Sequence, residues 1–381
     1  MNPESPTRWV WQQPNWPSFN WDSAALTKPL AQARRIQGEL GGLYKLLDAK
    51  VDLALQLEVL TIEGVTSSAI EGEKLDPNAL RSSIARRLGL PTAGLPPSSR
   101  STEGLAEVLL DATRNYDREF TIKRLSAWQA ALFPTGRSGL HEIRVGELRG
   151  TEPMRIVSGP IGKERVHYEA PPRDRLDAQM QTFLTWFNNP PPTLDGLLRA
   201  GLAHAWFEIL HPFEDGNGRV GRALLDMALA QDEKRPTPLY SLSAQFSEKR
   251  EEYYRALEQA SSGALDVTLW LDWFLRQFEN AARTSTGTVD RVLTRARFWM
   301  RHGQTELNER QRKALDRMLE AGPEGFTGGM TNRKYASLTK ASPATAQRDL
   351  ADLVSKGCFA LSGSGRSARY ELITSLQHAG G

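Results

Sequence analysis

The sequence predicts a mostly α-helical protein with one short β-hairpin, followed by a small module of helices and a second hairpin. Apolar residues recur at helical spacing over most of the chain up to about residue 285. Residues 154–172 differ, because two short β-like runs flank a turn rich in glycine and proline. Beyond residue 284 basic residues accumulate, which indicates a separate module. We therefore expect an aromatic arm and helices over 1–100, a helical core over 101–285, and a linker helix with the module over 286–381.

The composition excludes several classes of protein. The 381 residues are enough for two or three domains, and 40% hydrophobic with 24% charged residues is not the composition of a disordered chain. The single cysteine, Cys358, excludes an internal disulfide framework and a cysteine-based zinc site. We find no 18-residue apolar stretch and no signal peptide, so we expect a cytoplasmic protein without a membrane span. A net charge of +3 does not by itself indicate a nucleic-acid partner.

The first 22 residues contain four of the ten tryptophans, and Pro14 and Pro17 interrupt any regular helix there. We expect a structural arm over a hydrophobic surface, with a partner-binding arm as the alternative. Helices are then expected over 24–73, 77–89, 102–113, 125–133, 174–187, 194–210, 219–231, 247–259, 267–281 and 291–301.

One segment, residues 211–222 with the sequence HPFEDGNGRVGR, combines groups that suit phosphate chemistry. Glycines let a backbone approach an anion closely, and the helix expected from residue 219 presents unpaired N–H groups to it. Arg219 and Arg222 share one helix face and can read phosphate bidentately. Asp215 is a hard ligand suited to Mg²⁺, and His211 can act as a general base near neutral pH.

Other interpretations of this segment are weaker. Gly216-x-Gly218-x-x-Gly221 matches the dinucleotide fingerprint, but that motif requires a preceding strand, and a helix is expected here. A Walker P-loop is absent from the sequence. A solvated loop between two helices is the remaining alternative.

The segment resembles the signature of the Fic (filamentation induced by cAMP) family, HxFx(D/E)GNGRxxR, at every specified position. A weaker similarity extends over residues 1–285, so we expect a Fic-type helical core with a hairpin flap. The resemblance implies transfer of AMP from ATP, with Mg²⁺, to a Ser, Thr or Tyr hydroxyl of a target protein or of the chain itself. It also implies roles for the residues of the segment. His211 would deprotonate the hydroxyl, Asp215 would hold Mg²⁺, and ATP would contact Asp215, Gly216, Asn217, Gly218, Arg219, Val220, Gly221 and Arg222.

A second motif precedes the signature. In Ser67-Ser68-Ala69-Ile70-Glu71-Gly72, Ser67 and Glu71 lie on one helix face, and Gly72 permits close approach. Taken alone, an amphipathic helix with an exposed acid explains this pattern. The segment is also similar to the inhibitory motif (S/T)xxxE(G/N) of Fic proteins with an N-terminal inhibitory helix. That similarity implies that Glu71 pairs with Arg222 and blocks productive binding of ATP.

Two further assignments follow from the resemblance. The hairpin is similar to the flap that docks target proteins, with Val166, His167 and Tyr168 over the active site, and a plain structural hairpin is the alternative. Tyr254 would stack on adenine, although Ser261 replaces an asparagine that some members have.

Residues 307–372 carry a surplus of four basic residues and show two short helices followed by a hairpin pattern. This order resembles a winged helix-turn-helix module, in which Gln347, Arg348, Arg366 and Arg369 would face DNA. A protein–protein or homodimer contact of the same fold is the alternative.

The sequence thus predicts an autoinhibited protein adenylyltransferase. Two alternatives stay open: removal of AMP through the same site, and a nucleotide-sensing winged-helix regulator that binds DNA. The target protein is not identified by the sequence.

Overall fold

The computed structural model describes residues 8–45, 47–92, 95–158, 165–236, 239–320, 328–363 and 367–374. The chain divides into two units, of which the first comprises Met1–Leu46 and Gln56–Arg283, and the second Leu47–Leu55 and Thr284–Gly381. The boundary near residue 284 lies where the composition changes. The residues on both sides of the expected division between 100 and 101 lie in the first unit.

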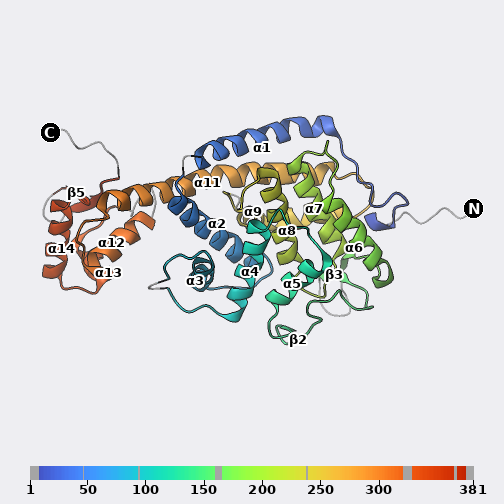
Figure 1. Cartoon of the computed structure of the whole chain (residues 1–381), viewed down its shortest axis with the longest axis horizontal. Coiled ribbons are helices and arrows are strands. Elements are labelled where there is room, and N and C mark those ends of the chain that lie inside the picture. Colours follow the sequence, from blue (N-terminus) through green and yellow to red (C-terminus); the bar gives the residue numbers. More distant parts are fainter. Residues whose placement is uncertain are drawn as a thin grey trace, which may run out of the picture. The chain divides into compact units, whose positions relative to one another are not determined.

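Two buried helices form the centre of the first unit (Figure 1). Helix α7 (Gly196–Leu210) is apolar on nearly all sides, as a core helix must be, and α8 (Asn217–Glu233) is buried over most of its length. Helices α4 (Arg100–Arg114), α5 (Ile122–Leu132) and α6 (Arg173–Asn188) surround this pair. The short loop between α7 and α8 is therefore held at both ends by the core.

Helix α2 (Ala49–Ile70) corrects one sequence expectation. It contains an 18-residue window with a mean hydropathy of 1.2, long and apolar enough to cross a membrane by composition, and 61% of that window is buried. In the fold this apolar surface packs against other helices. A Cβ atom at Gly64 would lie 2.7 Å from Leu80 of α3 (Pro77–Arg87) and 3.0 Å from Leu109 of α4. The apolar character of α2 therefore serves close packing in the core.

The N-terminal arm covers apolar surface, as the structural interpretation expects. Trp9 and Val10 are buried with Tyr168, Ile209 and Leu265 in one cluster. A 3-10 turn, η1 (Val10–Gln12), precedes α1 (Ser23–Tyr44). Trp16 and Phe19 contact Trp206 edge to face, with ring centroids 6.1 and 5.7 Å apart.

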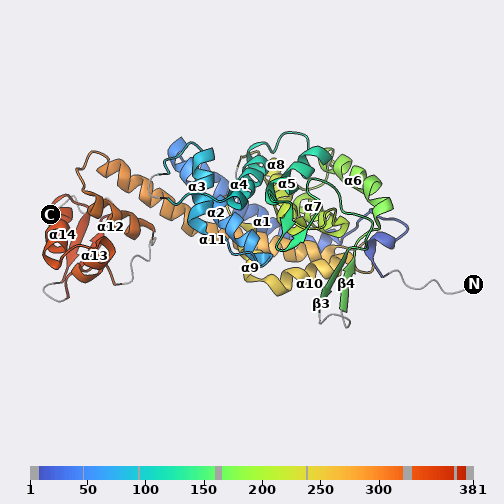
Figure 2. The ribbon, with the colours of Figure 1, turned by 90° about the horizontal axis from the view of Figure 1, so that it is seen from below.

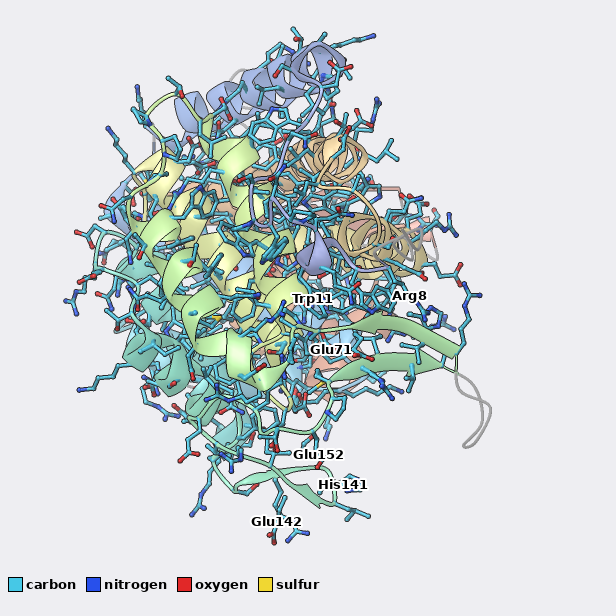
Figure 3. The ribbon with its side chains drawn as sticks, turned by 90° about the vertical axis from the view of Figure 1, so that its right-hand side faces the viewer. Arg8, Trp11, Glu71, His141, Glu142 and Glu152 are labelled. Carbon is cyan, nitrogen blue, oxygen red and sulfur yellow. The ribbon has the colours of Figure 1, made fainter. Side chains whose placement is uncertain are left out.

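Strands β3 (Arg155–Ser158) and β4 (Arg165–Glu169) form the predicted antiparallel hairpin, which lies beside α10 (Arg250–Ser261) in Figure 2. Ile156 pairs with Tyr168 and Val157 with Val166, with an irregularity between the two pairs. The arm fastens one strand of this hairpin. Trp11 Nε1 donates to the Glu169 carbonyl at 2.8 Å, and Arg8 donates to the Val166 carbonyl at 2.8 Å. In Figure 3 both side chains lie along the hairpin. The edge of β4 is thus occupied by the arm.

Further elements of the first unit depart from the sequence expectations. A small hairpin of β1 (Arg137–Ser138) and β2 (His141–Glu142) was not predicted. Helix α9 (Leu242–Glu248) precedes α10. The two helices expected at 267–281 and 291–301 form one continuous helix, α11 (Thr268–His302).

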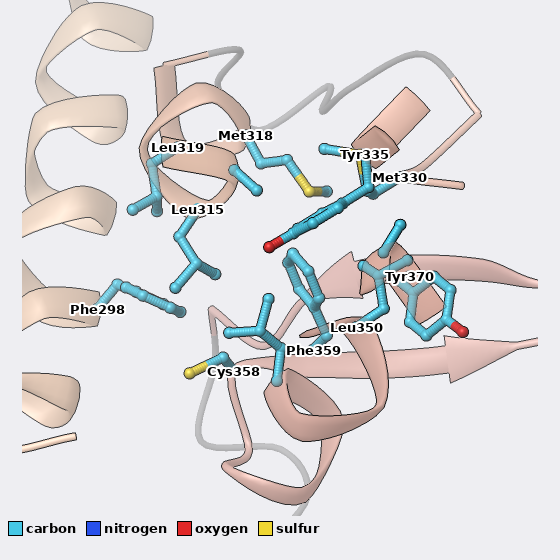
Figure 4. Packing of buried hydrophobic residues seen from close by; sticks show 13 residues of the cluster. Phe298, Leu315, Met318, Leu319, Met330, Tyr335, Leu350, Cys358, Phe359 and Tyr370 are labelled. Carbon is cyan, nitrogen blue, oxygen red and sulfur yellow. The ribbon is translucent and has the colours of Figure 1, made fainter. Parts of the chain in front are cut away.

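The second unit contains α12 (Glu309–Glu320), α13 (Asn332–Thr339) and α14 (Pro343–Ser355), followed by antiparallel strands β5 (Phe359–Ser362) and β6 (Arg369–Leu372). Its core gathers Phe298, Tyr335, Leu350, Phe359 and Tyr370, as Figure 4 shows. The order of two helices and a hairpin is the one predicted for this module. A buried hydroxyl is satisfied within it, because Tyr335 donates to Asp349 at 3.0 Å.

Two of the four residues expected to face DNA form hydrogen bonds within the module, although both are exposed. Gln347 accepts from Asn332 at 2.9 Å, and Arg369 donates to the Gly328 carbonyl. Arg348 is exposed on α14, and Arg366 lies outside the described residues.

Candidate active site

The loop between α7 and α8 is shaped by an unusual backbone at its first residue. His211 ends α7 in the left-handed conformation, with φ of 46° and ψ of 60°. Left-handed backbone is disfavoured for residues with a Cβ, so neighbouring contacts must hold it. Asn217 closes the loop, because its side chain accepts from the Phe213 N–H at 2.9 Å and donates to the Phe213 carbonyl at 2.8 Å. The buried Phe213 ring anchors the same turn.

The N-terminus of α8 is built for close approach. Gly216 has φ of 88°, which favours glycine, and helix geometry leaves the first N–H groups without an intrahelical acceptor. At Gly218 a Cβ atom would lie 2.1 Å from Glu71 Oε1, so the Glu71 carboxylate rests directly on this glycine. A carboxylate thus already occupies the position where an anion is attracted by the helix dipole.

Arg222 is buried and bonds to the end of α2 through its Nε and Nη2 atoms. Its guanidinium donates to Ser67 Oγ, to the Ser67 carbonyl and to Glu71 Oε1, each at 2.8 Å. Burial acts against the charge of Arg222 and is the largest single effect, but the charge and hydrogen bond of Glu71, together with Tyr253 and Glu208, outweigh it and raise the pKa of the guanidinium. The contact between Glu71 and Arg222 is the one that the motif resemblance implies.

Gly72 has a different task from the expected one. A Cβ atom there would meet nothing within 4 Å, so close approach does not require glycine. Glycine is required here because φ is +80°. With this backbone conformation the N–H of Gly72 bonds to the Ala69 carbonyl, and the N–H of Glu73 bonds to the Ser68 carbonyl. This is a Schellman ending, with glycine in the left-handed position. It turns the chain back so that Glu73 follows Glu71 into the site.

Glu73 pairs with the first arginine of the signature. Arg219 donates to Glu73 Oε2 at 2.7 Å, and its guanidinium lies 4.9 Å from the centre of the Phe133 ring. From the sequence we expected Arg219 to bind a phosphate group and expected no role for Glu73. Both arginines that would read phosphate are therefore paired with carboxylates from one short segment.

His211 is kept neutral by its surroundings. Burial lowers its pKa to about 4, and the positive charge of Arg149 acts in the same direction. The Glu208 backbone, Glu71 and Asp215 partly offset this effect. A neutral imidazole at pH 7 can accept a proton, which is what a general base must do.

Asp215 presents its carboxylate beside the β1–β2 hairpin. Ser138 Oγ bonds to Asp215 Oδ2, and the Gly216 N–H bonds to Oδ1 at 2.5 Å. The described residues contain no cluster of three or more His, Cys, Asp or Glu side chains that could hold a metal. A single carboxylate still fits Mg²⁺ that arrives with nucleotide phosphates, because Mg²⁺ keeps several waters and needs few protein ligands.

A cavity of about 780 Å³ brings some of these groups together, but neither Asp215 nor Arg219 lines it. Its lining includes His211, Glu71, Gly218 and Arg222, together with Tyr254 and the neighbouring residues Tyr253, Leu257, Glu258 and Ser261 of α10. Tyr254 is 42% exposed in this cavity. A larger groove of about 900 Å³, lined by the arm and α1, lies away from the signature.

Of the eight signature residues assigned to ATP, only Gly218 and Arg222 are among the described residues that line this cavity. Val220 and Gly221 face elsewhere. Val220 is fully buried, and its N–H bonds to the Gly216 carbonyl at 3.0 Å. Gly221 packs against Glu208, where a Cβ atom would lie 2.4 Å from Oε1, and its carbonyl accepts from buried His204. Both residues pack the helix instead of lining the cavity.

The flap residues also separate. His167 lines the cavity and bonds to Ser158 Oγ at 2.6 Å. Tyr168 also borders the cavity, but it is only 4% exposed and donates its hydroxyl to the Ile209 carbonyl at 2.6 Å, so it anchors the hairpin and is not free to dock a target. Among the described residues of this hairpin, the exposed apolar side chains are Ile156 and Val157 of β3, at 45% and 48%.

Glu208 is a further acid in the cavity that the sequence analysis missed. Burial raises its pKa to about 8, with Arg222 opposing and Glu71 adding to this rise. Its Oε1 has no hydrogen-bond partner among the described residues. A carboxyl three residues before His211 gives no signal in the sequence pattern by itself.

Comparison with known proteins now identifies the domain. Residues 119–229 match the model of the Fic/DOC family, and residues 9–90 match a domain of unknown function, DUF4172. The protein carries a Fic domain. The Fic match contains the whole loop between α7 and α8, and the second match contains Glu71 and Glu73.

Named relatives support this assignment. The chain is 35% identical over 100 residues to the "Probable protein adenylyltransferase aq_aa38" of Aquifex aeolicus, covering 26% of this chain and 28% of that protein. It is 31% identical over 117 residues to the protein adenylyltransferase fic-1 of Caenorhabditis briggsae, covering 29% and 22%. The matched part therefore spans less than a third of each relative.

Solved structures show the same fold. A Fic family protein from Desulfovibrio desulfuricans has a TM-score of 0.52 at 20% identity, covering 94% of this chain and 98% of that chain. Fic-1 from Caenorhabditis elegans has a TM-score of 0.50 at 20% identity, covering 70% and 73%.

Proposed function

We propose that this Fic domain protein transfers AMP from ATP to a hydroxyl of a protein. The observation that carries the proposal is the meeting of His211, the N-terminus of α8 and Arg222 in one cavity that also reaches Tyr254. Adenylyltransferase names among the relatives support the same reaction class.

The chemistry follows from these groups. The attacking hydroxyl gives its proton to neutral His211 while its oxygen bonds to the α-phosphorus of ATP. The bond from that phosphorus to the bridging oxygen breaks, and pyrophosphate leaves. Arg219, Arg222 and the first N–H groups of α8 bind and orient the phosphates. Asp215 would hold Mg²⁺, which would neutralise phosphate charge.

The resting protein is inhibited in this proposal. Glu71 occupies Arg222 and rests on Gly218, and Glu73 occupies Arg219. ATP phosphates must displace both carboxylates before the α-phosphate can face His211. A barrier increase of about 1.4 kcal/mol already slows a reaction tenfold, so one partly buried pair is a sufficient brake.

The target protein would dock on β3. The arm already bonds to the carbonyls of Val166 and Glu169 on β4. Strand β3 is exposed along its length and carries Ile156 and Val157. An extended target segment can add to such an edge through main-chain hydrogen bonds.

The test uses ATP labelled at the α-phosphate, with Mg²⁺, on wild type, Glu71→Gly, and Glu71→Gly with His211→Ala. We expect weak self-labelling in wild type, strong labelling in the single variant and none in the double variant. Absence of label in all three, with ATP still bound, contradicts the proposal. Release of AMP from a modified protein by wild type but not by Glu71→Gly would instead favour AMP removal.

A further inference from the structure

Arg149 is a buried cation that no part of the reaction above employs. It is 2% exposed, and no carboxylate pairs with it among the described residues. A buried charge without an acidic partner is costly, so its hydrogen bonds must compensate. Burial accordingly lowers the pKa of Arg149.

Within the described part of the chain, Arg149 forms its hydrogen bonds with backbone carbonyls. Its Nε donates to the His211 carbonyl at 2.9 Å, its backbone N–H donates to the Pro212 carbonyl at 2.9 Å, and its guanidinium also bonds to the Pro171 carbonyl. Tyr168 adds a fourth bond, from its hydroxyl to the Ile209 carbonyl at 2.6 Å. The Ile209 carbonyl is thus held by the Tyr168 side chain, the His211 carbonyl by the Arg149 side chain, and the Pro212 carbonyl by the Arg149 backbone N–H.

These hydrogen bonds lie at the C-terminal end of α7, where the backbone conformation of His211 is disfavoured. His211 is left-handed, and the carbonyl end of a helix carries a partial negative charge that a cation stabilises. Arg149 is not among the residues that line the cavity, so it touches neither nucleotide nor target there. It acts on the reaction only through the peptide of His211.

We propose that Arg149, supported by Tyr168, is a positioning residue that fixes the backbone of His211 and so aims its imidazole into the cavity. This inference rests on the proposed role of His211 as the base. The positive charge has a second consequence. Three charged groups face the imidazole from different elements: Arg149 before β3, Glu71 after α2, and Asp215 in the loop. Arg149 is the cation among them, and it lowers the pKa of His211.

The experiment compares Arg149→Met, Arg149→Lys and Tyr168→Phe in the Glu71→Gly background. Arg199→Met is the matched control, because Arg199 is also buried and donates to a carbonyl, that of Phe187, at 2.7 Å. Imidazole signals of histidine-labelled protein are titrated by NMR, with His211→Ala for assignment, and the kcat and KM of AMP transfer are measured separately.

We expect Arg149→Met to raise the pKa of His211 by about one unit, the usual effect of a nearby charge. Arg149→Lys should keep most of that pKa and still lower kcat about tenfold, because the forked donor is lost. Tyr168→Phe should lower kcat less, and the KM for ATP should stay within about twofold throughout. Arg199→Met should change stability alone.

An unchanged titration and unchanged kcat in both Arg149 variants would overturn the inference, as would equal losses in Arg149→Met and Arg199→Met. If Arg149→Met does not fold, Arg149→Lys and Tyr168→Phe carry the kinetic test. If Glu71→Gly transfers no AMP at all, the proposed function fails, and the NMR titration still decides whether Arg149 controls His211.

Discussion

At the scale of single residues, the ion pair between Glu73 and Arg219 gives the sharpest consequence. The Glu73 side chain is 37% exposed, so the pair contributes at most about 1 kcal/mol. Glu73→Gln should therefore raise AMP transfer by no more than about fivefold, and mainly in the Glu71→Gly background, where Arg222 no longer pairs with a carboxylate from that segment. Initial rates at subsaturating ATP would measure this.

Glu58→Gln is the matched control for that variant. Glu58 lies on the same helix, α2, and pairs with Arg81 at 2.6 Å within the first unit. It should leave transfer unchanged. A decrease in transfer with Glu73→Gln would mean that Glu73 assists the reaction instead of restraining it.

Which site residues could be foreseen depended on where their contacts lie. His211, Asp215 and Arg222 stand in a continuous segment whose chemistry can be read from spacing alone. Arg149 and Ser138 reach that segment only through tertiary contacts, and Arg149 does so through carbonyls that any sequence supplies. Glu73 was missed because its direction depends on the turn at Gly72.

At the scale of elements, the backbone turn that ends α2 places the two carboxylates, Glu71 and Glu73, against the arginines of the site. Gly72→Ala places a side chain at φ of +80°, which costs about 1 kcal/mol. We expect a lower melting temperature together with faster AMP transfer, because the turn that presents both carboxylates is strained. Thermal unfolding and the α-phosphate label measure the two effects.

Gly38→Ala supplies the contrast for that element. Gly38 lies in α1, and a Cβ atom there would meet nothing within 4 Å. It should raise stability by about 0.5–1 kcal/mol and leave transfer unchanged. Faster transfer in Gly38→Ala as well would show that the effect at Gly72 is not specific to the brake.

Elements were foreseen where periodicity is long and missed where it is short. Helix α7 and the β3–β4 hairpin follow directly from apolar spacing and from a turn rich in glycine. Strands β1 and β2 have two residues each, too few for a period to register. The helix break expected between residues 281 and 291 was wrong, because Ser285 and Gly287 lower helix propensity without ending α11.

At the scale of the whole molecule, buried acids make stability depend on pH. Burial raises the pKa of Glu208 to about 8, and it also raises that of Asp226 and Glu63 beneath Arg222. Each of these groups holds its proton in the folded protein at a pH where the unfolded chain has lost it. Rising pH therefore favours unfolding.

The buried histidines change the stability in the opposite direction, and they do so over a lower pH range. Burial lowers the pKa of His211 to about 4 and that of His204 to about 3, so both bind protons more readily when unfolded. Their contribution to stability grows as pH rises and is complete above their ordinary value of about 6.5. Between pH 6.5 and 8 the pH dependence of stability therefore reports on the buried acids and not on these two histidines.

Between pH 6.5 and 8 we expect the free energy of unfolding of the wild type to fall by on the order of 2 kcal/mol. The carboxylates of the unfolded chain are ionised throughout this interval. Those of the folded protein are still protonated at pH 6.5 and must release their protons as the pH rises. Glu208→Gln should reduce this fall, because an amide has no proton to release, and Asp226 and Glu63 should account for the remainder. Urea unfolding at several pH values measures it, with exposed Glu119→Gln as the control that keeps the wild-type slope. Two results would contradict this prediction: a wild-type stability that does not change between pH 6.5 and 8, or a fall that persists in Glu208→Gln. Either result would mean that Glu208 is ionised in the folded protein. The cavity beside His211 would then be more polar than its burial implies.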